Sequence, residues 1–335
     1  MKNCVLFAFI PLIALMFGCE KAVETTVLNA GKWDLVRKAD STKHYIGICF
    51  ADQLNGWVVG DSGRVLHTSN AGDSWETQST GTTVSLRCVQ FIGTQTGWAA
   101  GSNAIGMTKD GGHLWNWRYF PGDPRKGFLC MSFANLTAGW IGDNFGGILH
   151  TEDGGMTWTT QISGTSWAIT SVQFLDAQEG WAVSVHGEIL HTIDGGNNWT
   201  IKTLGSLDCG NTGDCTDIFF INHSLGWIAT NNMLSSMANA LSPIVHTSDA
   251  GKAWVCQPVP TMMTTSLQFV NERSGWAAGW NGILHTTNGG VNWDYQVEAS
   301  SGTFIDLYFV GLYFVDQSHG WAITFMGNIY RYQAL

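Results

Sequence analysis

Charged side chains are scarce in this 335-residue chain, because Asp, Glu, Lys and Arg together make up only 13% of it. Lys and Arg number 16 against 26 Asp and Glu, which gives a formal net charge of −10. A nucleic-acid partner is therefore not expected, since binding phosphates requires a basic face. The 41 glycines and 17 tryptophans instead suit many short strands joined by tight turns.

An apolar run at the N-terminus is too short to cross a membrane. Val5–Phe17 follows Lys2 and is broken only by Pro11, whereas a membrane-spanning helix needs about 20 apolar residues. Its length is typical of the apolar core of an export signal. The run ends in Met16-Phe17-Gly18-Cys19, which resembles a bacterial lipoprotein signal. We predict a signal peptide over residues 1–18, lipidation of Cys19 and a tether over residues 19–29. Phe17 departs from the small residue usual there, so ordinary secretion with cleavage nearby is the alternative.

Two patterns recur along the chain. A box of the form Thr-x-Asp-x-Gly-x-x-Trp, with Asn in place of Asp in two copies, occurs six times, at Thr68–Trp75, Thr108–Trp115, Thr151–Trp158, Thr192–Trp199, Thr247–Trp254 and Thr286–Trp293. A Phe followed seven positions later by the Trp of a Gly-Trp pair occurs seven times, and these Trp residues lie 41 to 49 residues apart. This is the period of a four-stranded propeller blade. Residues 30–335 are therefore predicted to form an all-β, seven-bladed β-propeller of four-stranded antiparallel blades.

Each box is predicted to be a structural turn between the third and outer strands of a blade. Its glycines allow positive φ, and its acidic or amide side chain can accept backbone N–H bonds across the turn. We assign this structural role to Asn70, Asp110, Asp153, Asp194, Asp249 and Asn288.

Seven inner strands but only six boxes leave one outer strand missing at the C-terminal end. The segment Asn29–Val36 echoes the start of a box, and Trp33 lies 24 residues before Trp57. We therefore expect Trp33–Lys38 to pair with a strand near Asn328–Tyr332 and to complete the last blade. Such closure removes exposed sheet edges.

Loop lengths vary on one face of the predicted ring only, in the connections between strands 2 and 3 and between blades. Because binding residues concentrate on variable loops of a rigid scaffold, this face is the predicted binding surface. Trp167 and Trp280 lie in these loops and are the leading candidates, together with Phe145, His186 and Phe325. The alternative is that these side chains only plug the mouth of the ring. The longest variable segments are Gly205–Cys215, Thr230–Pro243 and Glu298–Thr303, with Phe120–Gly127 a lesser one.

The remaining reactive residue types give no catalytic or metal-binding pattern. One His recurs on the third strand of five blades and is assigned to packing, because the ring spreads these residues too far apart to share an ion. A disulfide between Cys209 and Cys215 is expected in an exported protein. Cys88 with Cys130 is a second possible pair, and Cys49 and Cys256 have no evident partner. Three carboxylates, Asp61, Asp143 and Asp217, lie toward the variable face.

The boxes resemble the Asp-box (BNR) repeats of sialidases, sortilin-type receptors and some glucanases. The fuller pattern, Phe174-x6-Trp181 followed by Ile189-Leu190-His191-Thr192-x-Asp194-Gly195-Gly196-x-x-Trp199, is similar to the photosystem II stability/assembly factor family. That resemblance implies a seven-bladed chaperone that binds a membrane-protein assembly intermediate through an arginine-rich patch. The arginines of this chain are scattered, and the Arg-Ile-Pro sequence of sialidases is absent.

These observations favour an exported, membrane-anchored propeller that faces the periplasm or the cell exterior. We expect a monomer without cofactor or metal that binds a protein or polymer on the variable face and has no catalytic activity. A glycan-binding or glycan-hydrolysing protein related to Asp-box glycosidases is the alternative.

The anchor gives the first testable prediction. Metabolic labelling with palmitate should mark the wild-type protein but not Cys19→Ala, because only the Cys19 thiol accepts the lipid. Equal labelling of the two proteins, or no labelling of either, would contradict the predicted anchor.

Overall fold

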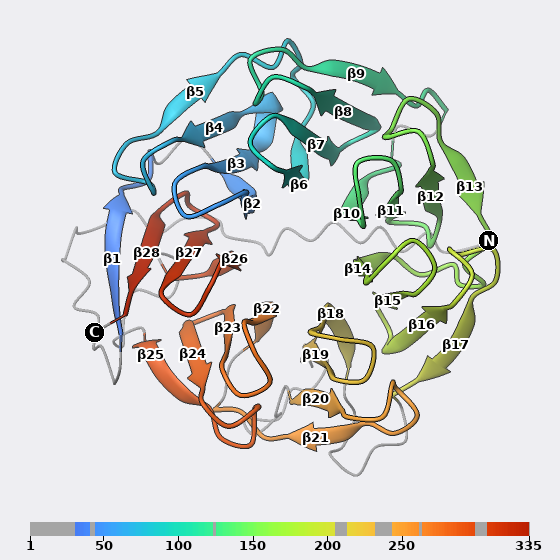
Figure 1. The fold of residues 1–335 in the computed structure, drawn as a ribbon, viewed down its shortest axis with the longest axis vertical. Coiled ribbons are helices and arrows are strands. Elements are labelled where there is room, and N and C mark those ends of the chain that lie inside the picture. The colour runs from blue at the N-terminus through green and yellow to red at the C-terminus, as the bar shows by residue number, and fades with distance from the viewer. Residues whose placement is uncertain are drawn as a thin grey trace, which may run out of the picture.

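The computed structural model describes residues 31–40, 44–122, 125–204, 213–231, 243–260, 263–298 and 307–334. These residues form seven four-stranded antiparallel sheets arranged around a central axis (Figure 1). The predicted seven-bladed propeller is confirmed. The predicted signal peptide, Cys19 and tether lie outside the described residues, as do most of the longest variable loops.

The strands of each blade follow one another from the axis outward. Blades 1 to 3 consist of β2 (Tyr45–Phe50), β3 (Gly56–Gly60), β4 (Val65–Thr68) and β5 (Glu76–Gln78); β6 (Leu86–Ile92), β7 (Thr96–Gly101), β8 (Ala104–Thr108) and β9 (Asn116–Tyr119); and β10 (Phe128–Phe133), β11 (Gly139–Asp143), β12 (Ile148–Thr151) and β13 (Thr159–Gln161). Blades 4 to 6 consist of β14 (Ile169–Phe174), β15 (Gly180–Ser184), β16 (Glu188–Thr192) and β17 (Thr200–Thr203); β18 (Asp214–Phe220), β19 (Gly226–Asn231), β20 (Ile244–Thr247) and β21 (Val255–Gln257); and β22 (Thr264–Phe269), β23 (Gly275–Gly279), β24 (Gly282–Thr286) and β25 (Asp294–Glu298).

Blade 7 joins the two ends of the described chain. It consists of β26 (Phe309–Phe314), β27 (His319–Thr324), β28 (Ile329–Gln333) and the N-terminal strand β1 (Lys32–Arg37). Within the described ranges the single helical element is the short 3-10 turn η1 (Asp61–Gly63), and no helix there is long and apolar enough to cross a membrane.

The Gly-Trp pair of each blade forms the core between neighbouring blades. The indole stacks on the Phe of the next blade's inner strand, with ring centroids 3.6 Å apart for Trp57 and Phe91. The preceding residue must be Gly because the blade's own Phe covers it: a Cβ at Gly56 would lie 2.3 Å from the Phe50 ring. The recurrent His adds a further layer, since His67 stacks on Trp57 at 4.8 Å. The repeated residues are thus explained by packing.

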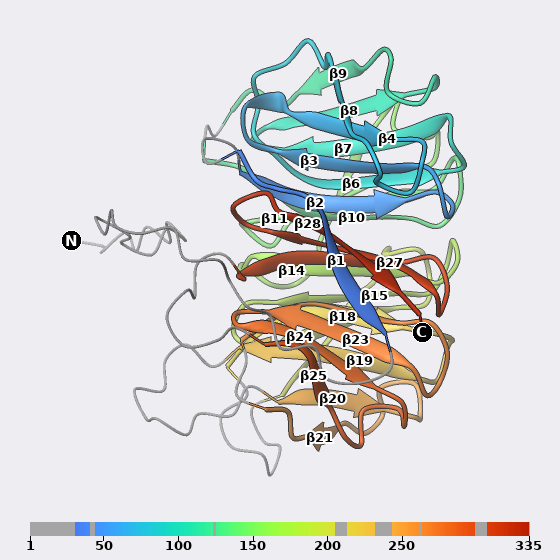
Figure 2. The ribbon, with the colours of Figure 1, turned by 90° about the vertical axis from the view of Figure 1, so that its left-hand side faces the viewer.

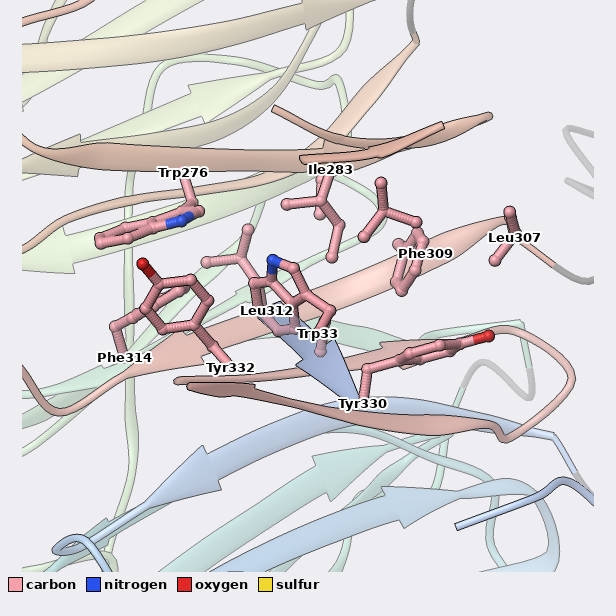
Figure 3. Close-up of a cluster of buried hydrophobic side chains, with 12 residues drawn as sticks. Trp33, Trp276, Ile283, Leu307, Phe309, Leu312, Phe314, Tyr330 and Tyr332 are labelled. Carbon is pink, nitrogen blue, oxygen red and sulfur yellow. The ribbon is translucent and has the colours of Figure 1, made fainter. Parts of the chain in front are cut away.

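The N-terminal strand closes the ring as predicted. β1 pairs antiparallel with β28, and Trp33 lies opposite Tyr332. The Trp33 indole is 5% exposed and packs edge-on against Phe314 at 5.8 Å (Figure 3). Its Nε1 donates a 2.9 Å hydrogen bond to Oε1 of Gln296 in blade 6. The closing strand is therefore held by its backbone pairing with β28, by the packing of the buried Trp33 indole and by the buried hydrogen bond from Trp33 to Gln296.

Replacing Trp33 should destabilise the fold far more than replacing Leu35, an exposed apolar residue of the same strand. Trp33→Ala removes a buried indole and should lower the free energy of unfolding by about 3–5 kcal/mol. Leu35→Ala is the control, because Leu35 is 49% exposed. Chemical denaturation measures both. Equal effects of the two changes would show that β1 does not hold the ring closed.

Candidate functional site

The two faces of the ring are built from different connections (Figure 2). On one face, the turn between strands 2 and 3 bonds to the residue that leads into the same blade: Trp280 N donates to Met263 O at 2.9 Å, and Phe325 N donates to Tyr308 O at 2.8 Å. On the other face, each box bonds to the turn between strands 1 and 2, as Gly154 N does to Thr137 O at 2.8 Å. We call the first the loop face and the second the box face. The predicted division of the connections is confirmed.

Two of the predicted aromatic residues belong to a continuous row on the loop face. Trp280 lies 5.2 Å from Tyr308, Tyr308 lies 6.1 Å from Phe325, and Phe325 stacks on His44 at 4.5 Å between ring centroids. The row crosses blades 6, 7 and 1, and all four rings are partly exposed. Sequence reasoning missed Tyr308 and His44, because each immediately precedes an inner strand and neither belongs to the repeat.

The other three predicted residues lie elsewhere on this face, in two separate groups. Trp167 is 40% exposed and lies 3.9 Å from the His186 ring. The backbone N–H of His186 donates to Asp214 Oδ1 at 3.1 Å. Phe145 is 46% exposed and lies beneath the guanidinium of Arg125, 5.8 Å away. The structure therefore places the five candidates on one face but not in one cluster.

An axial cavity of about 240 Å³ lies between the inner strands. Each inner strand has a β-bulge, so one residue of each strand is left out of the regular pairing with strand 2 at this level. Blades 4 to 6 line the cavity with hydroxyls, because Thr170, Thr216 and Thr265 each donate a hydrogen bond to a carbonyl of the next blade. Blades 7, 1 and 3 present Gly311, Ile46 and Leu129. The lining is thus polar on one side and mostly apolar on the other.

Asp217 is a part-buried carboxylate in the wall of this cavity. Its Oδ1 accepts hydrogen bonds from Ser171 Oγ at 2.7 Å and from Ile218 N at 2.9 Å, and its Oδ2 accepts one from Leu267 N at 2.8 Å. Burial raises the pKa of Asp217 to about 6, although the three hydrogen bonds oppose the shift. The carboxyl therefore links blades 4, 5 and 6 while titrating near neutral pH.

The other two candidate carboxylates have local partners. Asp143 accepts hydrogen bonds from the backbone of Phe145 and Gly147 and pairs with Lys126 Nζ at 2.9 Å. Asp61 lies 3.3 Å from Nδ1 of His44. The three carboxylates thus belong to blades 1, 3 and 5, each with its own contacts.

The box residues make the contacts that a turn-capping role requires. In blade 3, Asp153 Oδ1 accepts from Thr157 N and Thr151 Oγ1, both at 2.8 Å. Hydrogen bonds from the Thr157 side chain and backbone lower the pKa of Asp153 to about 2. The equivalent contacts occur in the other five boxes, at Asn70, Asp110, Asp194, Asp249 and Asn288.

The cysteine predictions need correction. Cys215 has a free, fully buried thiol packed in the core of blade 5, so the predicted disulfide with Cys209 is wrong; Cys209 itself lies outside the described residues. Cys88 and Cys130 are also free, as is Cys49. Burial raises the pKa of the Cys88 and Cys130 thiols, which keeps them protonated. Cys256, which has no evident partner in the sequence, is disulfide-bonded.

The repeats, the ring and its closure agree with a family comparison. The model of the photosynthesis system II assembly factor Ycf48 matches residues 24–170. The predicted family resemblance is confirmed. The photosystem II assembly lipoprotein Ycf48 of Synechococcus sp. (strain CC9902) is 25% identical over 172 residues, which cover 48% of this chain and 50% of that relative. The match thus spans only half the length of the relative.

Solved propellers share the fold at lower identity. A structure of Ycf48 bound to a D1 peptide superimposes with a TM-score of 0.70 at 18% identity, covering 94% of this chain and all of that one. The GH74 enzyme of Niastella koreensis gives a TM-score of 0.68 at 13% identity, covering 92% of this chain and 53% of that one. The same ring therefore occurs both in a peptide-bound protein and in an enzyme, and the fold alone does not decide between them.

The raised pKa of Asp217 predicts a pH-dependent stability difference. A carboxyl with a pKa of about 6 in the folded state and its ordinary pKa of 3.8 in the unfolded state holds its proton more tightly when folded. Its contribution is therefore lost as the pH rises through that window, by up to about 3 kcal/mol. Asn cannot ionise, so the stability of Asp217→Asn relative to wild type should rise between pH 4 and pH 7.

Unfolding measured across this pH range tests the prediction. The control is Asp153→Asn, whose stability difference from wild type should be flat between pH 5 and pH 7, because the Asp153 carboxyl is ionised there in both states. A flat profile for Asp217→Asn as well would contradict the burial of a titrating carboxyl in the cavity wall.

Proposed function

We propose that this protein is a membrane-anchored, extracytoplasmic propeller that binds a protein partner on its loop face and acts as an assembly scaffold. The observation that carries the proposal is the row of partly exposed rings formed by Trp280, Tyr308, Phe325 and His44. Aromatic side chains offer large contact areas at low conformational cost and are enriched at the centres of protein interfaces.

The chemistry around the row suits a protein segment. Rings from three neighbouring blades give a continuous apolar strip, and Asp61 beside His44 adds a polar end at blade 1. Trp167 and Phe145 extend the contact area over blades 3 and 4. This arrangement resembles an interface with an aromatic centre and a polar rim.

The similarity to Ycf48 supports the same proposal. The relative is named a photosystem II assembly lipoprotein, and a solved Ycf48 structure holds a D1 peptide. We therefore propose that the partner is a polypeptide and that the anchor is the lipidated Cys19. The identity of the membrane protein assembled is a separate question, because the solved structures share only the fold with this chain.

A glycan-active protein is the second candidate, because exposed aromatic rings also stack on sugars. A glycosidase would need two carboxylates flanking a sugar-binding cleft. Asp61, Asp143 and Asp217 instead make separate local contacts in three blades. We therefore favour the binding function, and a hydrolysis screen over a glycan panel tests the choice: turnover abolished by Asp143→Asn or Asp217→Asn would favour an enzyme.

Partner capture tests the loop face directly. The full-length protein is crosslinked in its native cells, and the species recovered with wild type are compared with those recovered with variants. Trp280→Ala combined with Phe325→Ala should reduce recovery of the specific partner at least about tenfold, since each buried aromatic anchor contributes 2 kcal/mol or more at a typical interface.

The matched control changes the opposite face. Leu114 is 64% exposed and belongs to the blade 2 box, so Leu114→Ala removes an exposed apolar side chain without touching the loop face. Both proteins should melt as wild type does. Undiminished capture by the loop-face variant, or equal loss with the control, would contradict the proposed binding surface.

A further inference from the structure

The axial cavity carries two charges that have no partner of opposite sign. Arg87 in β6 lines the cavity with an exposed side chain, and within the described ranges its guanidinium makes neither an ion pair nor a hydrogen bond. Asp217 in β18 lines the same cavity and, among the residues that the structure describes, accepts hydrogen bonds only from neutral groups, Ser171, Ile218 and Leu267. A part-buried carboxylate without a cation is costly, which suggests that a ligand supplies the missing positive charge.

The repeat shows that the fold needs neither charge. The equivalents of Asp217 in the two flanking blades are Ser171 and Ser266, and Ser266 Oγ still accepts a hydrogen bond from Leu312 N of the next blade. The equivalents of Arg87 in blades 1, 3 and 4 are Ile46, Leu129 and Thr170. A neutral residue thus serves the structure at both positions elsewhere in the ring.

The two charged residues line one cavity from strands of different blades. Figure 1 shows β6 and β18 on opposite sides of the central axis. The cavity between them has a volume of about 240 Å³, which equals the liquid volume of about eight water molecules. The space is therefore large enough for a small organic molecule and too small for a folded segment of another protein.

We propose that the axial cavity binds a small zwitterion, an amino-carboxylate whose carboxylate pairs with Arg87 and whose ammonium pairs with Asp217. Guanidinium offers several N–H donors in a fork that matches a carboxylate. An ammonium has three donors, and beside Asp217 the hydroxyl oxygens of Thr216 and Ser266 have lone pairs available to accept them. The apolar wall formed by Ile46, Leu129 and Gly311 faces the methylene chain between the two charged ends.

This site is independent of the proposed protein interface. The aromatic row lies in the turns and loops of the loop face, whereas Arg87 and Asp217 lie within the inner strands that surround the axis. Loss of one function should therefore leave the other measurable, and failure of one proposal does not decide the other.

Isothermal titration of the full-length protein at neutral pH tests the proposal. The probes are glycine, β-alanine, γ-aminobutyrate and ε-aminocaproate, which act as rulers for the distance between the two charges. Caproate and hexylamine are the matched probes that each carry one charge. At least one zwitterion should bind, and both single-charge probes should bind about tenfold more weakly or worse, since one lost charged contact is worth 1.4 kcal/mol or more.

Variants locate the site. Arg87→Gln and Asp217→Asn should each weaken binding of the preferred zwitterion about tenfold or more. Arg64→Gln is the control, because Arg64 follows η1 outside the cavity and should leave the affinity unchanged. Melting curves check that each variant is folded; if Asp217→Asn is not, Arg87→Gln decides the test alone.

Three results would overturn the proposal. The first is that the folded wild-type protein binds none of the four zwitterions. The second is that a single-charge probe binds as tightly as the best zwitterion. The third is that folded Arg87→Gln binds as wild type does.

Discussion

One hydrogen bond recurs at five of the seven boundaries between blades and holds each of these blades to the next. The indole N–H of the strand-2 Trp crosses the blade boundary and donates to a carbonyl in the box of the following blade. Trp98 reaches Gly154 O at 2.8 Å, Trp140 reaches Gly195 O at 3.0 Å, and Trp321 reaches Ala71 O at 2.8 Å. Because a buried N–H needs a partner, the turn geometry of one blade and the core of its neighbour depend on each other.

The box carbonyl that accepts the indole N–H often accepts a second hydrogen bond, from a glutamine side chain. Gln161 Nε2 also donates to Gly195 O, at 2.7 Å, and Gln257 and Trp227 share Gly289 O in the same way. At the joint between blades 4 and 5, Lys202 Nζ reaches Gly251 O at 2.9 Å, and the Trp181 indole has no acceptor there. The box is thus both a turn and the docking point of its neighbour, which explains why its spacing is constant.

Blade 7 has no box, and the side chain of Gln296 supplies the hydrogen-bond acceptor that a box carbonyl supplies elsewhere. Gln296 Oε1 accepts from Trp276 Nε1 at 3.0 Å and from Trp33 Nε1 at 2.9 Å. One buried amide therefore serves the indole that lacks a box carbonyl and also fixes the closing strand. Because these contacts between neighbouring blades constrain the box face, loop length and side chains are free to vary on the loop face.

Much of this architecture could be predicted from the sequence, because the repeat has a fixed period. The spacing of Trp33 from Trp57 predicted the closing strand, and the variable connections predicted the loop face. The role of Gln296 and the partners of Trp280 and Phe325 could not be predicted, because they depend on contacts between blades that are distant in sequence. The Cys209–Cys215 pairing was wrong for a related reason: a short spacing says nothing of whether a side chain faces the core.

An alignment of the repeats within this sequence is enough to single out the two charged residues of the axial cavity. Aligning the inner strands sets Asp217 against Ser171 and Ser266, and Arg87 against Ile46 and Leu129. The repeat marks both as exceptions, but only the ring places them across one cavity. Residues that depart from the repeat therefore indicate where a ligand binds, whereas the repeated residues indicate only the fold.

A double-mutant cycle between Trp33→Phe and Gln296→Leu tests most directly whether side-chain joints hold the ring closed. Trp33→Phe keeps an aromatic ring but removes the indole N–H, and Gln296→Leu removes the acceptor. Unfolding free energies of the wild type, both single variants and the double variant give the coupling between the two residues. The account predicts a favourable coupling of about 1–2 kcal/mol. Strictly additive effects would contradict it.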